Sequence, residues 1–83
     1  MALKDEMELR LRAAFTVSEL EVVNESHRHA GHSGDDGSGE SHFAVRLRAA
    51  ELAPMGRLAR HRAVQAALGD IHKRLHALAL DLG

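Results

Sequence analysis

The chain has 83 residues, a length that fits a single small domain with one hydrophobic core, spanning residues 1–83. It contains no cysteine, which excludes disulfides and thiolate metal ligands, and no long apolar segment or basic, apolar leader, so we expect neither a membrane span nor a secretory signal. The formal net charge is −1, but residues 1–41 carry four Lys/Arg against nine Asp/Glu, whereas residues 42–83 carry seven against three.

The start of the chain predicts a helix followed by a strand. Leu3, Met7 and Leu11 recur at helical spacing with charged residues between them, which indicates an amphipathic helix over about residues 3–14. Acidic residues stand early in this segment and arginines late, the order that the helix dipole favours. Residues 19–25 then alternate well enough to predict a strand.

Residues 42–50 have the clearest strand pattern in the chain. Apolar side chains would face one side here and arginines the other, so we expect a half-buried strand. The apolar positions are Phe43, Val45, Leu47 and Ala49, and the arginines are Arg46 and Arg48. The preceding segment, about residues 27–41, is rich in glycine, serine and aspartate, which cannot build a core and predict a flexible surface loop.

The last third of the chain predicts a turn, a helix and a closing strand. Pro54 and Gly56 mark the turn, and an apolar stripe indicates a helix over about residues 57–73, which Gly69 is expected to split or bend. The stripe consists of Leu58, Val64, Leu68, Ile71 and Leu75. Leucines at 78, 80 and 82 then alternate as in a strand. The order α-β-β-α-β predicts an α/β fold with a three-stranded sheet and the helices packed on one face.

Seven histidines are the candidate metal ligands, because imidazole binds transition metals and the chain has no thiol. Three of them, His27, His29 and His32, crowd the glycine-rich loop, and such a tract also binds copper, nickel or zinc adventitiously. His61 and His72 are expected to be solvent-facing residues of the main helix. Taken alone, a histidine such as His76 is more often satisfied by a backbone carbonyl than bound to a metal.

Four short segments together resemble the BolA family. They are Asn24-Glu25-Ser26 before the histidine-bearing loop, Gly39-Glu40-Ser41-His42-Phe43, Arg60-His61-Arg62, and His76-Ala77-Leu78-Ala79-Leu80. Their order and spacing cover nearly the whole chain. The chain differs from many members in an acidic, glycine-containing insert in its loop, and its main helix is about one residue shorter before the last strand.

The resemblance implies an α/β fold similar to a class II KH domain and a cytoplasmic, non-enzymatic protein. BolA-like proteins bind monothiol glutaredoxins and share a [2Fe-2S] cluster with them and with glutathione, in iron–sulfur trafficking or iron homeostasis. Some members are DNA-binding transcriptional regulators of stress response and cell shape. An interaction domain of the same fold without a metal role is a third reading.

The resemblance also implies site residues. The histidine that opens the last strand, His76, is the expected cluster ligand. A loop histidine is the expected second ligand, with His29 as first choice and His27 and His32 as substitutes. His42 is expected to act behind the ligands, orienting the loop through a hydrogen bond.

Five basic residues of the main helix region are candidates for binding a partner or nucleic acid. They are Arg57, Arg60, Arg62, Lys73 and Arg74. Guanidinium groups suit the carboxylates of a glutaredoxin and its glutathione, and they also suit DNA phosphates. A solvated helix face is the alternative. Phe15 and Phe43 are the only aromatic residues and are expected in the core, so no platform for base stacking is predicted. No catalytic constellation is present.

Overall fold

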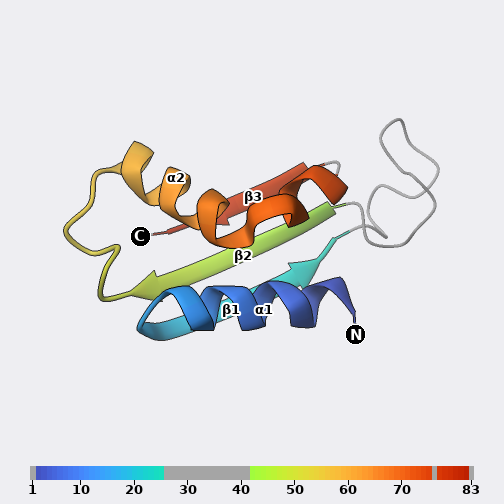
Figure 1. Cartoon of the computed structure of the whole chain (residues 1–83), viewed down its shortest axis with the longest axis horizontal. Helices are drawn as coiled ribbons and strands as arrows, with labels where there is room; N and C mark the ends of the chain where they lie inside the picture. Colours follow the sequence, from blue (N-terminus) through green and yellow to red (C-terminus); the bar gives the residue numbers. More distant parts are fainter. Residues whose placement is uncertain (1, 26–41, 76, 83) are drawn as a thin grey trace.

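The computed structural model describes residues 2–25, 42–75 and 77–82. Its elements follow the predicted order (Figure 1). They are helix α1 (Leu3–Ala14), strands β1 (Val17–Asn24) and β2 (His42–Ala49), helix α2 (Arg57–Leu68), the 3-10 helix η2 (Gly69–Arg74) and strand β3 (Ala77–Asp81). Among the described residues, no helix is both long and apolar enough to cross a bilayer.

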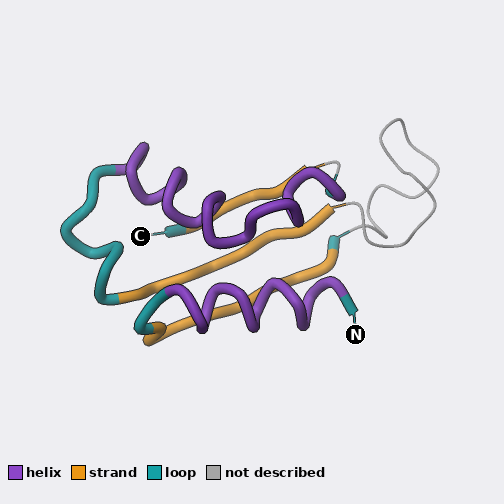
Figure 2. Tube along the Cα trace, in the orientation of Figure 1, coloured by secondary structure: helices purple, strands orange, loops and turns teal. Residues whose placement is uncertain are grey.

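The three strands form one mixed sheet in the order β1-β2-β3, with β2 antiparallel to β1 and parallel to β3. Both helices lie on the same face of this sheet, α1 alongside β1 and α2 over β2 and β3 (Figures 1 and 2). The expected α/β fold with helices on one face is therefore confirmed. A parallel pair needs a crossover connection, and α2 with η2 provides it between β2 and β3.

Alternation along β2 determines which side of the sheet is buried. Phe43, Val45 and Leu47 are each at most 2% exposed, while Arg46 between them is exposed. Across the ladder, Val45 pairs with Val22 on β1 and with Leu80 on β3. The strand period of two therefore places the apolar residues of all three strands under the helices, as the sequence predicted. β1 begins at Val17, two residues before its expected start.

Helical spacing explains which residues of α2 and η2 are buried and why the prediction for Leu58 was wrong. Val64, Leu68 and Ile71 are fully buried at intervals of four and three residues. Leu58 was predicted to belong to the same stripe, but it is 63% exposed. It precedes Val64 by six residues, which at 3.6 residues per turn rotates it about 120° away from the buried side.

Gly69 separates α2 from η2. Its φ of 59° lies in the left-handed region, where a side chain is strained, and a Cβ built there would stand 3.2 Å from Nη1 of Arg10. The predicted helix over 57–73 thus ends as an α-helix at Leu68 and continues in 3-10 form to Arg74. The expectation that Gly69 splits the helix is confirmed.

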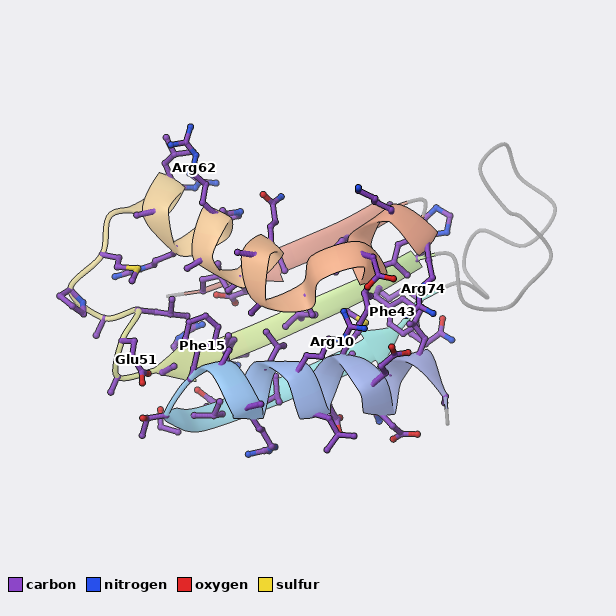
Figure 3. All side chains as sticks on the ribbon, viewed as in Figure 1. Arg10, Phe15, Phe43, Glu51, Arg62 and Arg74 are labelled. Carbon is purple, nitrogen blue, oxygen red and sulfur yellow. The ribbon has the colours of Figure 1, made fainter. Side chains whose placement is uncertain are left out.

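An ionic clamp ties α1 to both ends of η2. Nη1 of Arg10 donates to the carbonyl of Leu68 at 2.7 Å and to Oδ1 of Asp70 at 2.9 Å. The carboxylate of Glu6 accepts from Arg10 at 3.1 Å and from Arg74 at 3.0 Å. Figure 3 shows Arg10 and Arg74 lying between the two elements. The clamp holds the chain at Leu68 and at Arg74, and the hydrogen bond from Arg10 lowers the pKa of Asp70.

At the other end of β2, Glu51 joins the turn that follows the strand to the linker between α1 and β1. Its carboxylate accepts from the backbone N–H of Thr16 at 2.8 Å and from the hydroxyl of Thr16 at 2.9 Å. The N–H of Thr16 holds the pKa of Glu51 below its ordinary value. These bonds fix the start of β1 against the end of β2.

Replacing Leu11 by alanine is expected to destabilise the protein by about 2–5 kcal/mol, because the side chain is fully buried and its removal leaves a cavity. Urea denaturation measures the change. Leu9→Ala on the same helix is the control, since Leu9 is 56% exposed and its change should stay within about 0.5 kcal/mol. Equal losses in the two variants would contradict the assignment of the buried side of α1.

Asp70→Asn tests the clamp through its pH dependence. Because Arg10 lowers the folded-state pKa of Asp70, this carboxylate adds stability above its unfolded pKa and loses that contribution as the pH falls through the folded pKa. The variant should therefore be less stable than wild type at neutral pH, and the difference should disappear in acid. Urea denaturation across this range measures it; a difference that does not change with pH would show that the carboxylate charge is not what matters.

Candidate functional site

Three chain segments meet at one end of the sheet. β1 ends at Asn24 and β2 begins at His42, whose ladder partner on β3 is Ala77. The backbone N–H of Glu25 donates to the carbonyl of His42 at 2.8 Å. The described residues that flank the glycine-rich segment, Glu25 and His42, therefore lie at the same end of the sheet as the first residue of β3 (Figure 1).

The four predicted ligands lie outside the described residues. They are His76 and the loop histidines His27, His29 and His32. Their described neighbours are Glu25 and His42 for the loop, and Leu75 and Ala77 for His76. Within the described ranges, no three His, Asp or Glu side chains gather closely enough to hold a metal ion. The assignment of these histidines as ligands stays a prediction.

His42 is a buried polar residue at this end of the sheet, with 8% of its surface exposed. It is the first residue of the central strand and lies between Glu25, which bonds to its carbonyl, and Ala77. Burial fixes the residue between the loop ends and the start of β3. This buried position beside the base of the loop is consistent with the prediction that the His42 ring orients the loop.

Two of the five basic candidates make hydrogen bonds within the protein. Arg60 donates from Nε to the carbonyl of Leu52 at 2.8 Å and from Nη2 to that of Ala53 at 3.0 Å, which holds the turn before α2. Arg74 donates to Glu6 in the clamp. Both guanidinium groups therefore help to stabilise the fold.

Arg57, Arg62 and Lys73 are exposed and make no hydrogen bond or ion pair to another described residue. Arg57 and Arg62 lie in the first turns of α2, whereas Lys73 lies in η2, beyond the other end of that helix. An α-helix rises 1.5 Å per residue, so Arg57 and Arg62 are separated from Lys73 by about 15–25 Å along the helix axis. The basic residues do not gather into one surface.

The open face of the sheet is not a free basic surface either. Arg48 pairs with Asp81 at 2.8 Å, and Arg46 lies 3.6 Å from Glu19. The sequence analysis missed these partners, and it also missed the clamp. The Glu6–Arg10 spacing of four residues signals a pair within α1. Nothing local signals that Arg10 reaches residues 68 and 70.

His61 was expected to face solvent, but it is only partly exposed. It lines a groove between the N-terminal half of α2 and the end of β3, together with Arg57, Leu80 and Leu82. The side chain of His72, the other histidine expected to face solvent, is not described.

Comparison with known proteins gives a consistent set of relatives. The sequence is 47% identical over 83 residues to a Sinorhizobium protein described as "Uncharacterized protein in cobS 5'region", covering 98% of this chain and 89% of that protein. It is 40% identical over 81 residues to the Escherichia coli "DNA-binding transcriptional regulator BolA", covering 96% of this chain and 73% of the relative.

Solved structures agree with this result. BolA1 from Arabidopsis thaliana superposes with a TM-score of 0.81 at 30% identity, covering 95% of this chain and 87% of the other. The BolA domain of SufE1 from the same plant superposes with a TM-score of 0.83 at 29% identity, covering 99% and 91%. The family model for BolA-like proteins matches residues 11–83. The chain belongs to the BolA family.

Proposed function

We propose that this BolA-family chain is a non-enzymatic adaptor that binds a monothiol glutaredoxin and shares a [2Fe-2S] cluster with it. One observation supports this most directly. The residues that flank the histidine-rich segment, Glu25 and His42, lie at the same end of the sheet as Ala77, which directly follows His76. The described residues next to two histidine-bearing parts of the sequence, which are far apart along the chain, thus lie at one end of the sheet.

The donor chemistry of the chain fits one side of such a cluster. The chain has seven histidines and no cysteine, so it would bind iron through imidazole, with carboxylates as possible extra ligands, and thiolates must come from the partner and from glutathione. Histidine replaces cysteine on one iron in Rieske centres, which shows that a [2Fe-2S] cluster accepts such ligands. His76 and one loop histidine, His29 first, would hold it, and the bound cluster would supply iron and sulfide for transfer or a redox signal.

Described residues around the ligands have supporting tasks. The hydrogen bond from Glu25 to the carbonyl of His42 closes the base of the loop that carries the loop histidines. The clamp fixes Arg74, two residues before His76. Ala77 after it is small and exposed, so its side chain leaves room for a partner to approach. Only neutral imidazole binds iron, so acid should release the ligands.

His76→Ala is expected to abolish the heterodimeric cluster. The measurement is visible absorption and circular dichroism after reconstitution with a monothiol glutaredoxin, glutathione, iron and sulfide. Wild type should give a spectrum distinct from that of the glutaredoxin alone, and the variant should not, because one iron loses its ligand. His72→Ala is the matched control and should retain the wild-type spectrum.

The same assay identifies the second ligand. Single alanine variants of His27, His29 and His32 should differ, with His29→Ala losing the most signal. If each single variant keeps the signal and only the triple variant loses it, the loop histidines substitute for one another. A wild-type spectrum in His76→Ala would exclude His76 as a ligand, and absence of any heterodimer would reject the adaptor function.

DNA-binding regulation is the second candidate, favoured by the name of the Escherichia coli relative. The exposed cations Arg57 and Arg62 would contact phosphates. Arg57→Ala/Arg62→Ala should then weaken binding to a duplex and reduce the slope of log affinity against log salt by about 2, one for each lost contact. Fluorescence anisotropy at several salt concentrations measures this. An unchanged slope would remove these residues from a DNA interface.

A further inference from the structure

Helix α2 carries its positive charge at the end where the helix dipole opposes it. Its sequence, RLARHRAVQAAL, has three arginines and a histidine in the first six positions and no acidic residue at all. Gly56 at its N-cap makes no side-chain cap, and the first turn contains no acid. Because the N-terminus of a helix is its positive end, each cation there costs stability. Arg60 is explained by its bonds to the preceding turn, but Arg57 and Arg62 are not.

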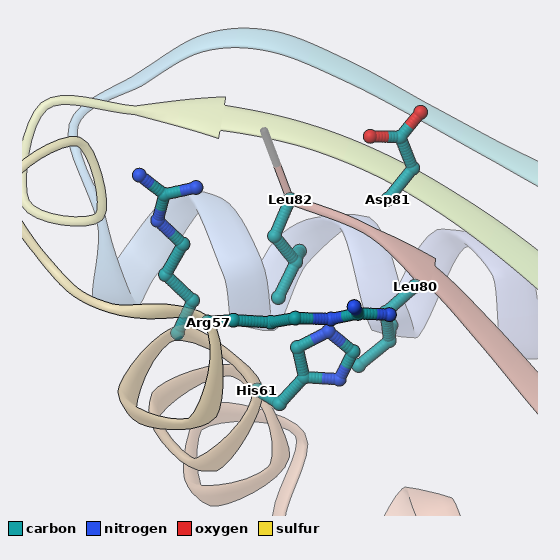
Figure 4. Close-up of a pocket in the computed structure, with 6 residues that line it drawn as sticks. Arg57, His61, Leu80, Asp81 and Leu82 are labelled. Carbon is teal, nitrogen blue, oxygen red and sulfur yellow. The ribbon is translucent and has the colours of Figure 1, made fainter.

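These cations border a groove. It has a volume of about 360 Å³ and lies between the first turns of α2 and the end of β3, so we call it the α2–β3 groove (Figure 4). Its lining consists of Arg57, Arg60, His61, Leu80, Asp81 and Leu82. Arg57 and His61 also line an adjoining hollow with Leu58, Arg62 and Gln65, so the two form one continuous surface.

One wall of the groove is an edge strand. Within the described part of the chain, β3 pairs with β2 alone, so no further strand lies along the outer edge of Ala77–Leu80, whereas the carbonyl of Asp81 accepts from Nη1 of Arg48 at 2.9 Å. Edge strands are usually protected by lysine, proline or a bulge. β3 has the sequence ALALD, in which the one charged residue, Asp81, is the last, and Ala77–Leu80 contains none of these features. It is therefore open to an additional strand.

The charges and apolar groups at the groove select the partner. The carboxylate of Asp81 is bound by Arg48 at 2.8 Å. Arg57 in the groove and Arg62 in the adjoining hollow make no ion pair with a described residue, so the rim keeps two positive charges. Leu58 is 63% exposed beside it, and Leu80 is only partly buried. A positive rim over apolar side chains matches a segment that alternates carboxylates with apolar residues.

We propose that the α2–β3 groove binds an extended acidic segment of a partner protein. The segment adds a strand to the edge of β3, its carboxylates bind Arg57 and Arg62, and its apolar side chains pack on Leu58 and Leu80. The groove lies at the C-terminal end of β3, whereas the proposed cluster ligand precedes its N-terminal end. The two sites are separate, so an experiment can reject one of the two proposals without rejecting the other.

The first experiment titrates ¹⁵N-labelled protein with a blocked heptapeptide that alternates valine and glutamate. Amide shifts are expected at residues 57–62 and 78–82 and not in α1. The same peptide with lysine in place of glutamate should leave these amides unchanged. If neither peptide moves them, the proposal is overturned; if a duplex or single-stranded oligonucleotide moves them and the acidic peptide does not, the groove binds nucleic acid instead.

Charge reversal supplies the matched variants. Arg57→Glu/Arg62→Glu should weaken binding of the glutamate peptide by about tenfold for each arginine and should permit binding of the lysine peptide. Lys4→Glu/Arg12→Glu on α1 changes the net charge equally and should leave binding of the glutamate peptide within about twofold. Equal weakening in both variants would show attraction by net charge alone and would overturn the proposal.

Thermal unfolding distinguishes a binding role from a structural one. An acid at the first turn of α2 suits the dipole, so Arg57→Glu is expected to raise Tm by about 2–4 °C while it weakens peptide binding. A variant that is more stable but binds less well would show that Arg57 is retained for binding. A lowered Tm would show that the arginine supports the fold and would overturn this part of the argument.

Discussion

Strand β2 bonds to a neighbour on both edges, and the two neighbours run in opposite directions. The antiparallel pairing brings the end of β1 to the start of β2, and the parallel pairing brings the start of β3 to the same place. The N-terminus of α2 is left at the opposite end. With about 3.3 Å per residue over the eight residues of β2, the histidine-bearing end and the arginine-bearing end lie about 25 Å apart.

Four of the seven lysines and arginines in residues 42–83 have partners within the described part of the protein, and one of them is Arg46, which lies 3.6 Å from Glu19. Arg48, Arg60 and Arg74 each bond to a carboxylate or a carbonyl of the protein, and Arg10 from the first half does the same. A count of charges along the sequence therefore overstates the surface that is available to a partner. The positive charge that remains available to a partner is concentrated at the start of α2, where the helix dipole makes a cation unfavourable.

The sequence predicted the elements where burial follows a regular period. Alternation in β2 and the spacing in α1 are local patterns, and both elements formed as expected. β1 starts earlier than expected because its pairing with β2 continues through an irregularity between Val17 and Glu19, which breaks the alternation. Arg10 meets Asp70 across 60 residues of sequence, so no local pattern reveals it. The histidines were singled out by residue type and family resemblance, because binding a metal requires donor atoms and imposes no periodic pattern on the sequence.

The hydrogen bond between Glu25 and the carbonyl of His42 has an evolutionary consequence. It closes the sheet just ahead of the segment that joins β1 to β2, so the core does not depend on how long that segment is. The entropic cost of closing a flexible connection grows only with the logarithm of its length, about 0.6 kcal/mol for each doubling. Insertions, deletions and substitutions can therefore accumulate in this segment with little loss of stability, and relatives with one scaffold can diverge in what this segment binds.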